Sequence, residues 1–134
     1  ASRGHITDNQ LNKLLEIVSG HNYKARFLVK LGDELKSIEN TEIAYFKAED
    51  NVVFLFTVKG KRYIIEHTLE ELERQVDPSE YFRLNRSFLA SMKAIKKISK
   101  YFNSRLAIDL EPATEEKVII SRKKVQPFLE WLEA

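Results

Sequence analysis

The sequence contains no cysteine among its 134 residues. This absence excludes disulfide frameworks, cysteine nucleophiles and thiolate metal sites, and it fits the reducing cytoplasm. There is also no uninterrupted apolar run of about 18 residues, so no segment is expected to span a membrane. The chain does not open with a signal-peptide pattern. A cytoplasmic protein that does not enter the membrane is therefore expected.

Sequence signals for catalysis and for cofactor binding are lacking as well. The three histidines, at positions 5, 21 and 67, do not have the spacing of metal ligands. Glycine-rich loops that bind phosphate are absent. The acidic residues within 70–73 fall at the start of a predicted helix, where the helix dipole explains them without acid–base chemistry. We therefore expect no enzyme activity, no cofactor and no metal.

Acidic residues are also missing from one long stretch, residues 81–108. Over the whole chain 22 basic residues stand against 20 acidic ones and the net charge is only +2, so affinity for a polyanion must come from a local patch. The basic residues of this stretch are Arg83, Arg86, Lys93, Lys96, Lys97, Lys100 and Arg105. Segregated positive charge with interleaved aromatic residues is typical of a polyanion-binding surface.

Hydrophobic periodicity predicts a mainly β domain over residues 27–134. From Phe27 onward apolar residues recur at every second position, and short turns separate the segments near 32–33, 49–51 and 59–61. Residues 52–58 are apolar on both faces, which predicts a central strand covered on two sides. We expect about eight to ten short strands in small antiparallel sheets, with two or three short helices, because no helical run is long enough for a parallel crossover.

Residues 1–26 are expected to be an arm that is at least partly helical. Its apolar residues recur at helical spacing, namely Leu11, Leu14, Leu15 and Val18. This stripe needs a partner, and two interpretations remain open. The arm packs on its own domain, or it is a linker from an upstream domain or a dimer contact.

Two further helices are predicted by their first residues. Thr68 and Glu71 have the spacing of a capping box, and the acidic helix that follows is expected to lie away from any phosphate backbone. Ser121 is expected to cap a terminal helix. Pro127 is tolerable in that helix only near its first turn, because proline lacks the N–H that the helix interior requires.

Arg86 is the first candidate for contact with a nucleic acid. It follows the alternating segment 81–85 and precedes apolar Phe88, so a strand would end by exposing its side chain. The planar guanidinium group can pair with two acceptors, such as O6 and N7 of guanine. Asn85 and Ser87 flank it and could hydrogen bond to adenine or phosphate. The alternative is a surface arginine that bonds a carbonyl or a carboxylate of its own protein.

A second basic cluster lies between a predicted strand and the last helix. Arg122, Lys123 and Lys124 could contact phosphate there, more so if the amino end of the helix also points at the anion. The alternative is an ordinary solvated turn. Lys97 and its neighbouring lysines more often form a solvated face, but they would raise the salt dependence of DNA binding. Asn51 lies in a turn that hairpin geometry alone would explain.

Taken in order, these motifs resemble the LytTR family of bacterial DNA-binding output domains. The resemblance runs from about Phe27 to Leu132 and rests on the segments TEIAYFKAEDN (41–51), TLEEL (68–72), FRLNRSF (82–88) and SRK (121–123). It implies a fold of small antiparallel sheets with short helices. Such domains bind DNA through loops rather than a recognition helix, and they bend it. They are usually fused behind a receiver domain, so the arm would be the interdomain linker.

By position, the resemblance implies three DNA-facing elements: residues 50–53, residues 85–87, and Arg122 with Lys123. We therefore expect sequence-specific binding of double-stranded DNA by the output domain of a two-component transcriptional regulator. Lysines would anchor phosphates, while Arg86 and Arg122 would read bases in successive major grooves of bent DNA. A homodimer on the DNA is an open expectation. The alternatives are a protein-interaction module with a basic face for an acidic partner, and single-stranded nucleic-acid binding with stacking on residues 101–102.

Overall fold

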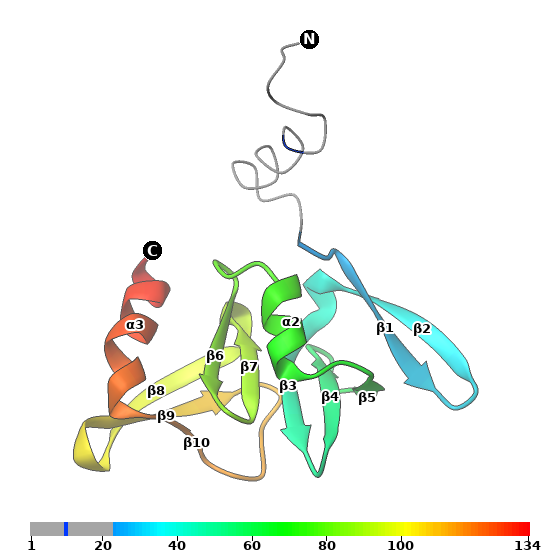
Figure 1. Cartoon of the computed structure of the whole chain (residues 1–134). Helices are drawn as coiled ribbons and strands as arrows, with labels where there is room; N and C mark the ends of the chain where they lie inside the picture. The colour runs from blue at the N-terminus through cyan, green and yellow to red at the C-terminus, as the bar shows by residue number, and fades with distance from the viewer. Residues whose placement is uncertain (1–9, 11–22) are drawn as a thin grey trace, which may run out of the picture.

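A computed structural model describes Gln10 and residues 23–134. Within these residues, ten strands form two antiparallel sheets, accompanied by two α-helices (Figure 1). The expected mainly β class is confirmed. The apolar stripe predicted for the arm, from Leu11 to Val18, lies outside the described residues. None of the helices described is both long enough and apolar enough to cross a bilayer.

The larger sheet contains seven strands and the smaller sheet three. The order in the larger sheet is β2 (Glu34–Glu39), β1 (Arg26–Leu31), β5 (Arg62–Ile65), β4 (Val52–Thr57), β3 (Ile43–Glu49), β7 (Phe88–Ser91) and β6 (Tyr81–Asn85). The order in the smaller sheet is β10 (Val118–Ile120), β9 (Arg105–Leu110) and β8 (Ile95–Tyr101). The helices are α2 (Leu69–Gln75) and α3 (Arg122–Glu133), and short 3₁₀ turns lie at Asn40–Glu42, Met92–Ala94 and Phe102–Ser104.

The hairpins are closed by residues that tolerate a left-handed backbone. Asp50 and Asn51 join β3 to β4 with φ values of 53° and 65°. A two-residue hairpin turn of type I′ requires a positive φ at both central positions, and Asn and Asp adopt it more readily than most residues. In the turn between β1 and β2, Gly32 has a positive φ of 65°.

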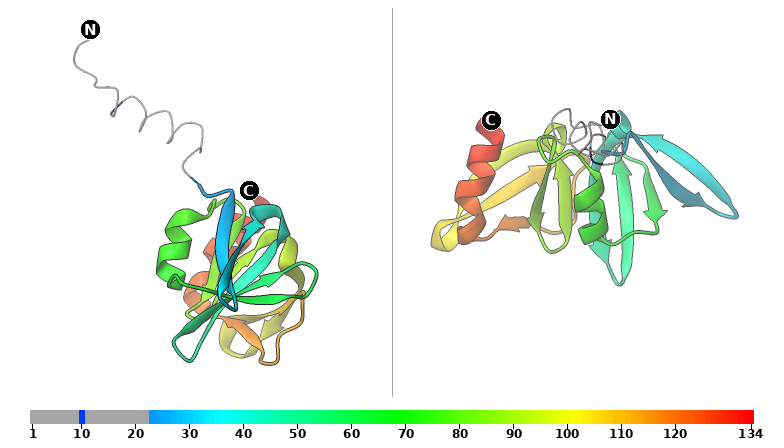
Figure 2. Two further views of the ribbon diagram at one scale, coloured as in Figure 1. Left: turned by 90° about the vertical axis from the view of Figure 1, so that its right-hand side faces the viewer. Right: turned by 45° about the horizontal axis from the view of Figure 1, so that its top comes forward.

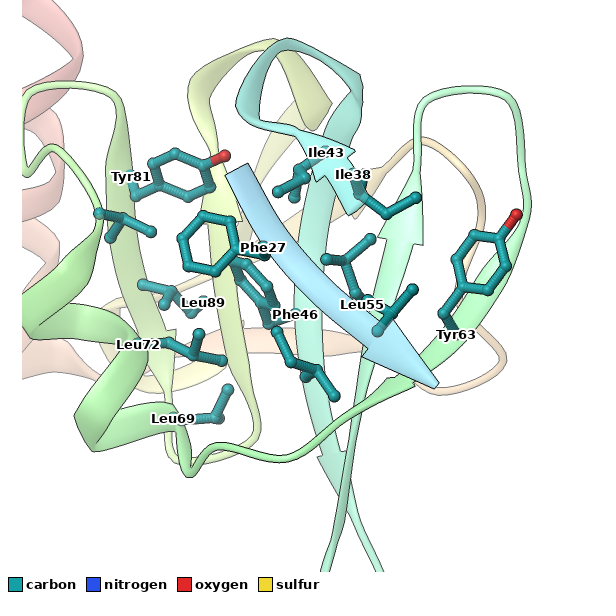
Figure 3. Close-up of a cluster of buried hydrophobic side chains, with 13 residues drawn as sticks. Phe27, Ile38, Ile43, Phe46, Leu55, Tyr63, Leu69, Leu72, Tyr81 and Leu89 are labelled. Atoms are coloured by element: carbon teal, nitrogen blue, oxygen red, sulfur yellow. The ribbon is translucent and has the colours of Figure 1, made fainter. Parts of the chain in front are cut away.

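Two hydrophobic cores lie on opposite faces of the larger sheet. On one face α2 covers a cluster that includes Phe27, Phe46 and Leu72 (Figure 3). On the other face the smaller sheet and α3 cover a second cluster, which includes Tyr45 and Phe128. Successive residues of a strand point to opposite faces, so β3 contributes Phe46 to one core and Tyr45 to the other.

The strand buried on both faces is β3 rather than the predicted β4. Five successive residues of β3, from Ile43 to Lys47, are buried, whereas β4 has only Leu55 and Thr57 fully buried. The sequence correctly placed β4 inside the sheet. One face of β4 is less covered because the smaller sheet and α3 pack mainly with side chains of β3, β6 and β7.

Polar contacts also fasten the loop between β9 and β10 to β3. The Tyr45 hydroxyl donates to the Pro112 carbonyl at 2.9 Å, and burial, followed by the charge of Glu116, raises the pKa of Tyr45 to about 12. Lys47 donates to Glu116 at 2.8 Å. Burial by itself would lower the pKa of Lys47, but its contacts with Glu116 and Glu49 outweigh burial and raise this pKa.

The last helix differs from its prediction in two details. Ser121 precedes α3 but makes no side-chain capping hydrogen bond; its main-chain carbonyl accepts from the Lys124 N–H at 2.9 Å. Pro127 lies in the second turn of α3, not near the first. The helix continues past it because Phe128 is fully buried and the Trp131 Nε1–H donates to the Pro78 carbonyl at 2.9 Å. Tertiary packing thus offsets the lost helical hydrogen bond.

Candidate nucleic-acid interface

Four connections lie along one edge of the molecule, at the bottom of Figure 1 and again in the right-hand view of Figure 2. They are the β3–β4 turn, the β6–β7 turn, the start of α3 and the β8–β9 turn. We call them together the turn edge, defined by Asn51, Arg86–Ser87, Arg122–Lys123 and Phe102–Ser104. The edge brings together segments that are far apart in the sequence, including all three DNA-facing elements implied by the resemblance.

Hydrogen bonds hold these connections in place relative to one another. The main-chain N–H of Ala48, near the end of β3, donates to the Ser87 carbonyl at 2.9 Å. The Asn85 side chain donates to the Ile119 carbonyl of β10 at 3.0 Å. Arg122 lines one surface hollow together with residues 103–105 of the β8–β9 turn. Each neighbouring pair of turns is therefore connected by direct contacts or by a shared surface.

Arg86 is exposed at the β6–β7 turn, as its position in the sequence predicted. Among the described residues its guanidinium group has no hydrogen-bond or ion-pair partner. The same holds, within that part of the chain, for the exposed side chains of Arg122 and Lys123. These cationic groups are thus available to an external anion, and the self-bonded alternative considered for Arg86 is not what the structure shows.

Arg83 organises the turn that carries Arg86. Its side chain is only 12% exposed. Its Nε donates to the Asn85 carbonyl at 2.7 Å, and Nη2 donates to the Arg86 carbonyl at 2.8 Å. Arg83 therefore fixes the main chain on which Arg86 is displayed. The sequence had placed Arg83 among the basic surface residues without this role.

The same guanidinium group binds the acidic helix α2. Nη1 of Arg83 lies 2.6 Å from the Glu73 carboxylate, and Nη2 lies 3.3 Å from that of Glu70. The main-chain N–H of Glu70, followed by Arg83, lowers the pKa of the Glu70 carboxyl. The helix α2 therefore lies beside the basic β6–β7 turn, and the expectation that it stays away from a phosphate backbone remains a prediction. Glu70 lines a hollow with Arg86 and Asn51, and its carboxylate pairs there with Arg83.

Asn85 shapes the turn through both ends of its side-chain amide. Its Oδ1 accepts hydrogen bonds from the main-chain N–H groups of Ser87 at 2.8 Å and Phe88 at 3.1 Å. This is the local side-chain–main-chain bonding that favours Asn in turns. Contact of Asn85 or Ser87 with DNA remains a prediction, and the observed role of Asn85 is to position the turn.

Lys124 is directed toward the protein. Its ammonium group donates to the Arg83 carbonyl at 2.9 Å and lies 5.9 Å from the centre of the Phe82 ring. Burial, the main cause, lowers the pKa of Lys124, while Glu73 opposes this shift and Arg83 adds to it. The structure thus gives Lys124 a structural partner, unlike Arg122 and Lys123, and its predicted phosphate contact remains untested.

Lys97 and Asn51 have different positions relative to the turn edge. Asn51 is exposed in the β3–β4 turn, beside the hollow that contains Arg86. Lys97 is exposed in the middle of β8, directly across from Asp109 of β9. It lines a hollow with Glu115 and Glu116. The structure therefore brings Asn51 together with Arg86 but leaves Lys97 among carboxylates.

Comparison with known proteins gives a consistent result. The family model of the LytTr DNA-binding domain matches residues 33–133. An uncharacterized response regulatory protein of Vibrio cholerae is 27% identical over 92 residues. The transcriptional regulatory protein YpdB of Escherichia coli K12 is 30% identical over 87 residues, and the sensory transduction protein LytT of Oceanobacillus iheyensis is 23% identical over 132 residues.

These relatives are longer than the chain. The matched segments cover 66%, 65% and 98% of this chain but only 35%, 35% and 54% of the respective relatives. Among solved structures, the LytTr DNA-binding domain of a methyl-accepting/DNA response regulator from Bacillus cereus superposes with a TM-score of 0.71 at 20% identity. That superposition covers 83% of this chain and 99% of the other, and it shows that the two share a fold.

Proposed function

Because this chain belongs to the LytTR family of DNA-binding domains, we propose that its turn edge recognises a specific sequence in double-stranded DNA. The supporting observation is that Arg86 and Arg122, both without protein partners among the described residues, project from the same edge and are joined through Arg83 and Lys124. An exposed guanidinium on a fixed main chain suits bidentate pairing with guanine.

The proposed recognition divides the work between two kinds of residue. Arg86 and Arg122 contact base edges in successive major grooves, and exposed lysines such as Lys123 neutralise phosphates and set the register. Bending of the DNA between the two contacts allows both to form, at an elastic cost that depends on sequence. Arg86 lies in a turn and Arg122 is the first residue of α3, so in this proposal neither contacts bases from along the face of a recognition helix.

We further propose that the chain is the output part of a bacterial two-component regulator. Relatives that match it are named as response regulatory or transcriptional regulatory proteins, and the chain covers 35–54% of the three compared above. In this proposal a receiver domain precedes the chain in the full-length protein, and residues 1–26 connect the two. Binding as a homodimer on DNA is part of the same proposal.

A salt titration tests the proposed function. A duplex selected from a random pool, the corresponding single strand and an acidic polypeptide are each titrated at several salt concentrations. Preference for the selected duplex, with a steep fall of log K against log salt, supports DNA recognition. Equal binding of the acidic polypeptide would favour a protein-interaction module, and preference for the single strand would favour base stacking. The stoichiometry on the selected duplex tests the homodimer.

A further inference from the structure

Phe102 is the most exposed large apolar side chain of the described residues, at 72%. It lies at the tip of the hairpin formed by β8 and β9. Single exposed apolar residues are common on protein surfaces and need no explanation by themselves. The position of this one is informative because the tip is part of the turn edge, adjacent to Arg122.

The tip is held in a defined conformation. Arg105 donates from Nε to the Phe102 carbonyl at 3.0 Å, and its guanidinium lies 5.0 Å from the centre of the Tyr101 ring. The rings of Tyr101 and Phe102 meet edge to face at 5.0 Å. Asn103 and Ser104 complete the turn with φ values of 58° and 60°. Phe102 is thus presented by an ordered hairpin, and its ring is not drawn into either core.

The surroundings of the tip favour an anionic partner. Lys117 lies 5.5 Å from the centre of the Tyr101 ring, on the same aromatic group that Arg105 covers. Arg122 shares a hollow with Arg105 and the turn residues. Residues 81–108 contain no Asp or Glu. An apolar surface of another protein would leave these cations without compensation, whereas a duplex offers phosphates around apolar base surfaces.

We propose that Phe102 is a further DNA-contacting residue, which packs its ring against a thymine methyl group or an exposed base edge beside the position read by Arg122. Apolar contact with the thymine methyl group is a recognised form of major-groove readout. The contact extends the turn edge beyond the three elements that contain basic or amide side chains. This inference rests on the proposed DNA recognition and adds an apolar component to it.

Substitution of Phe102 by alanine tests this contact on the selected duplex. Leu35→Ala is the matched control, because Leu35 is similarly exposed (65%) on β2, an edge strand outside the turn edge. Phe102→Ala is expected to bind the duplex about five- to thirtyfold more weakly. The slope of log K against log salt should not change, because no charge is removed. Leu35→Ala should bind like the wild type, and Phe102→Leu should fall between wild type and Phe102→Ala.

The outcomes separate this inference from the proposed function. If Arg122→Ala weakens binding while Phe102→Ala does not, the Phe102 contact is refuted and DNA recognition stands. If the wild-type protein shows no preference for any duplex, DNA recognition itself fails. A change of the salt slope in Phe102→Ala, with an unchanged melting curve, would mean that nearby cations had moved and would also refute the contact. A change of sedimentation behaviour in Phe102→Ala would refute it in favour of a contact between protein molecules.

Discussion

The ammonium group of Lys124 donates a 2.9 Å hydrogen bond to the main-chain carbonyl of Arg83, although the two residues are 41 positions apart in the sequence. The Arg83 guanidinium in turn donates to the Arg86 carbonyl at 2.8 Å. The two basic corners, Arg86 and Arg122, are thus connected through a pair of cations that are themselves bound to protein groups. A disturbance of this connection should affect both corners.

Loss of either exposed arginine should weaken recognition of the selected duplex. Arg86→Ala and Arg122→Ala are each expected to cost roughly 1–3 kcal/mol on that duplex and little on random DNA, because each removes a base contact. The measurement is a pair of binding isotherms at one salt concentration, on selected and random duplexes. Stability should change little, because both side chains are exposed.

Lys97→Ala is the comparison for these two variants. Removal of a lysine that contributes only to the positive field should weaken binding to selected and random duplexes alike. Since Lys97 lies near Asp109 and Glu116 rather than at the turn edge, we expect this common loss to be small. Equal losses on both DNAs for Arg86→Ala and Arg122→Ala would show that these arginines do not read bases.

Substitution of Arg83 should reduce DNA affinity without removing a DNA contact. Arg83→Ala leaves the carbonyls of Asn85 and Arg86 without their side-chain donor, so we expect a loss of stability of about 1–3 kcal/mol. Amide chemical shifts of residues 86–88 should move. Binding of the selected duplex should weaken even at temperatures at which the variant protein is still folded. Native-like amide shifts together with lost binding would indicate a direct DNA contact instead.

Glu73→Ala removes one carboxylate partner of Arg83 and is a milder change than Arg83→Ala. The sequence predicted that the acidic helix lies away from any phosphate backbone, and a nearly unchanged DNA affinity of Glu73→Ala would follow from that. In the structure Glu73 binds Arg83 at 2.6 Å, but Glu70 and two carbonyls also hold that guanidinium. We therefore expect a smaller loss of duplex affinity than for Arg83→Ala. An equal or larger loss would mean that the Glu73 pair, rather than the carbonyl bonds, sets the turn.

The capping box of α2 should stabilise the fold without affecting recognition. Thr68 Oγ1 accepts from the Glu71 N–H at 3.1 Å, and the Glu71 carboxylate accepts from the Thr68 N–H at 2.8 Å. Thr68→Ala is expected to cost about 1 kcal/mol in urea unfolding, because a helix donor loses its acceptor. Thr68→Ser, which keeps the hydroxyl, is the control. A wild-type midpoint for Thr68→Ala would show that the cap is not formed in solution.

Acid should weaken the fold partly through Glu116. The hydrogen bond from Lys47 is the main cause of the lowered pKa of this carboxyl. Folding therefore favours the ionised form, and the stabilisation is present above the ordinary value of 4.5 and is lost as the pH falls through the lowered pKa. Glu116→Gln should flatten the pH dependence of the unfolding midpoint below about pH 5. An unchanged profile would mean that the Lys47–Glu116 pair does not form in solution.

The sequence predicted the elements better than their covering layers. The alternation of apolar residues located the strands, and the spacing of Thr68 and Glu71 gave a capping box that the structure confirms. Periodicity assigns a side chain to a face, but it does not say which element covers that face. This is why the sequence predicted burial on both faces for β4, whereas the structure shows it for β3. It is also why the contact of α2 with Arg83 beside the basic turn was not foreseen.

The candidate site was predictable to a similar extent. The exposed position of Arg86 follows from the strand that precedes it, and Arg122 follows from a basic turn before a helix. The internal roles of Arg83, Asn85 and Lys124 could not be read in advance, because each has a partner distant in the sequence. Arg83 and Asn85 also make bonds within their own turn. One signal for the Arg83 contact was present in the sequence. Glu70 and Glu73 are three positions apart, so both carboxylates lie on one face of the predicted helix, where a cation can pair with them.

The left-handed backbone of the β3–β4 turn determines how Asn51 can be probed. With φ of 65°, this position favours Asn, Asp or Gly, so alanine scanning here would report backbone strain together with any lost DNA contact. Asn51→Gly deletes the amide while retaining the backbone geometry, and Asn51→Asp keeps the shape while adding a negative charge that repels phosphate. Comparing these two replacements isolates the contribution of the side chain from that of the hairpin.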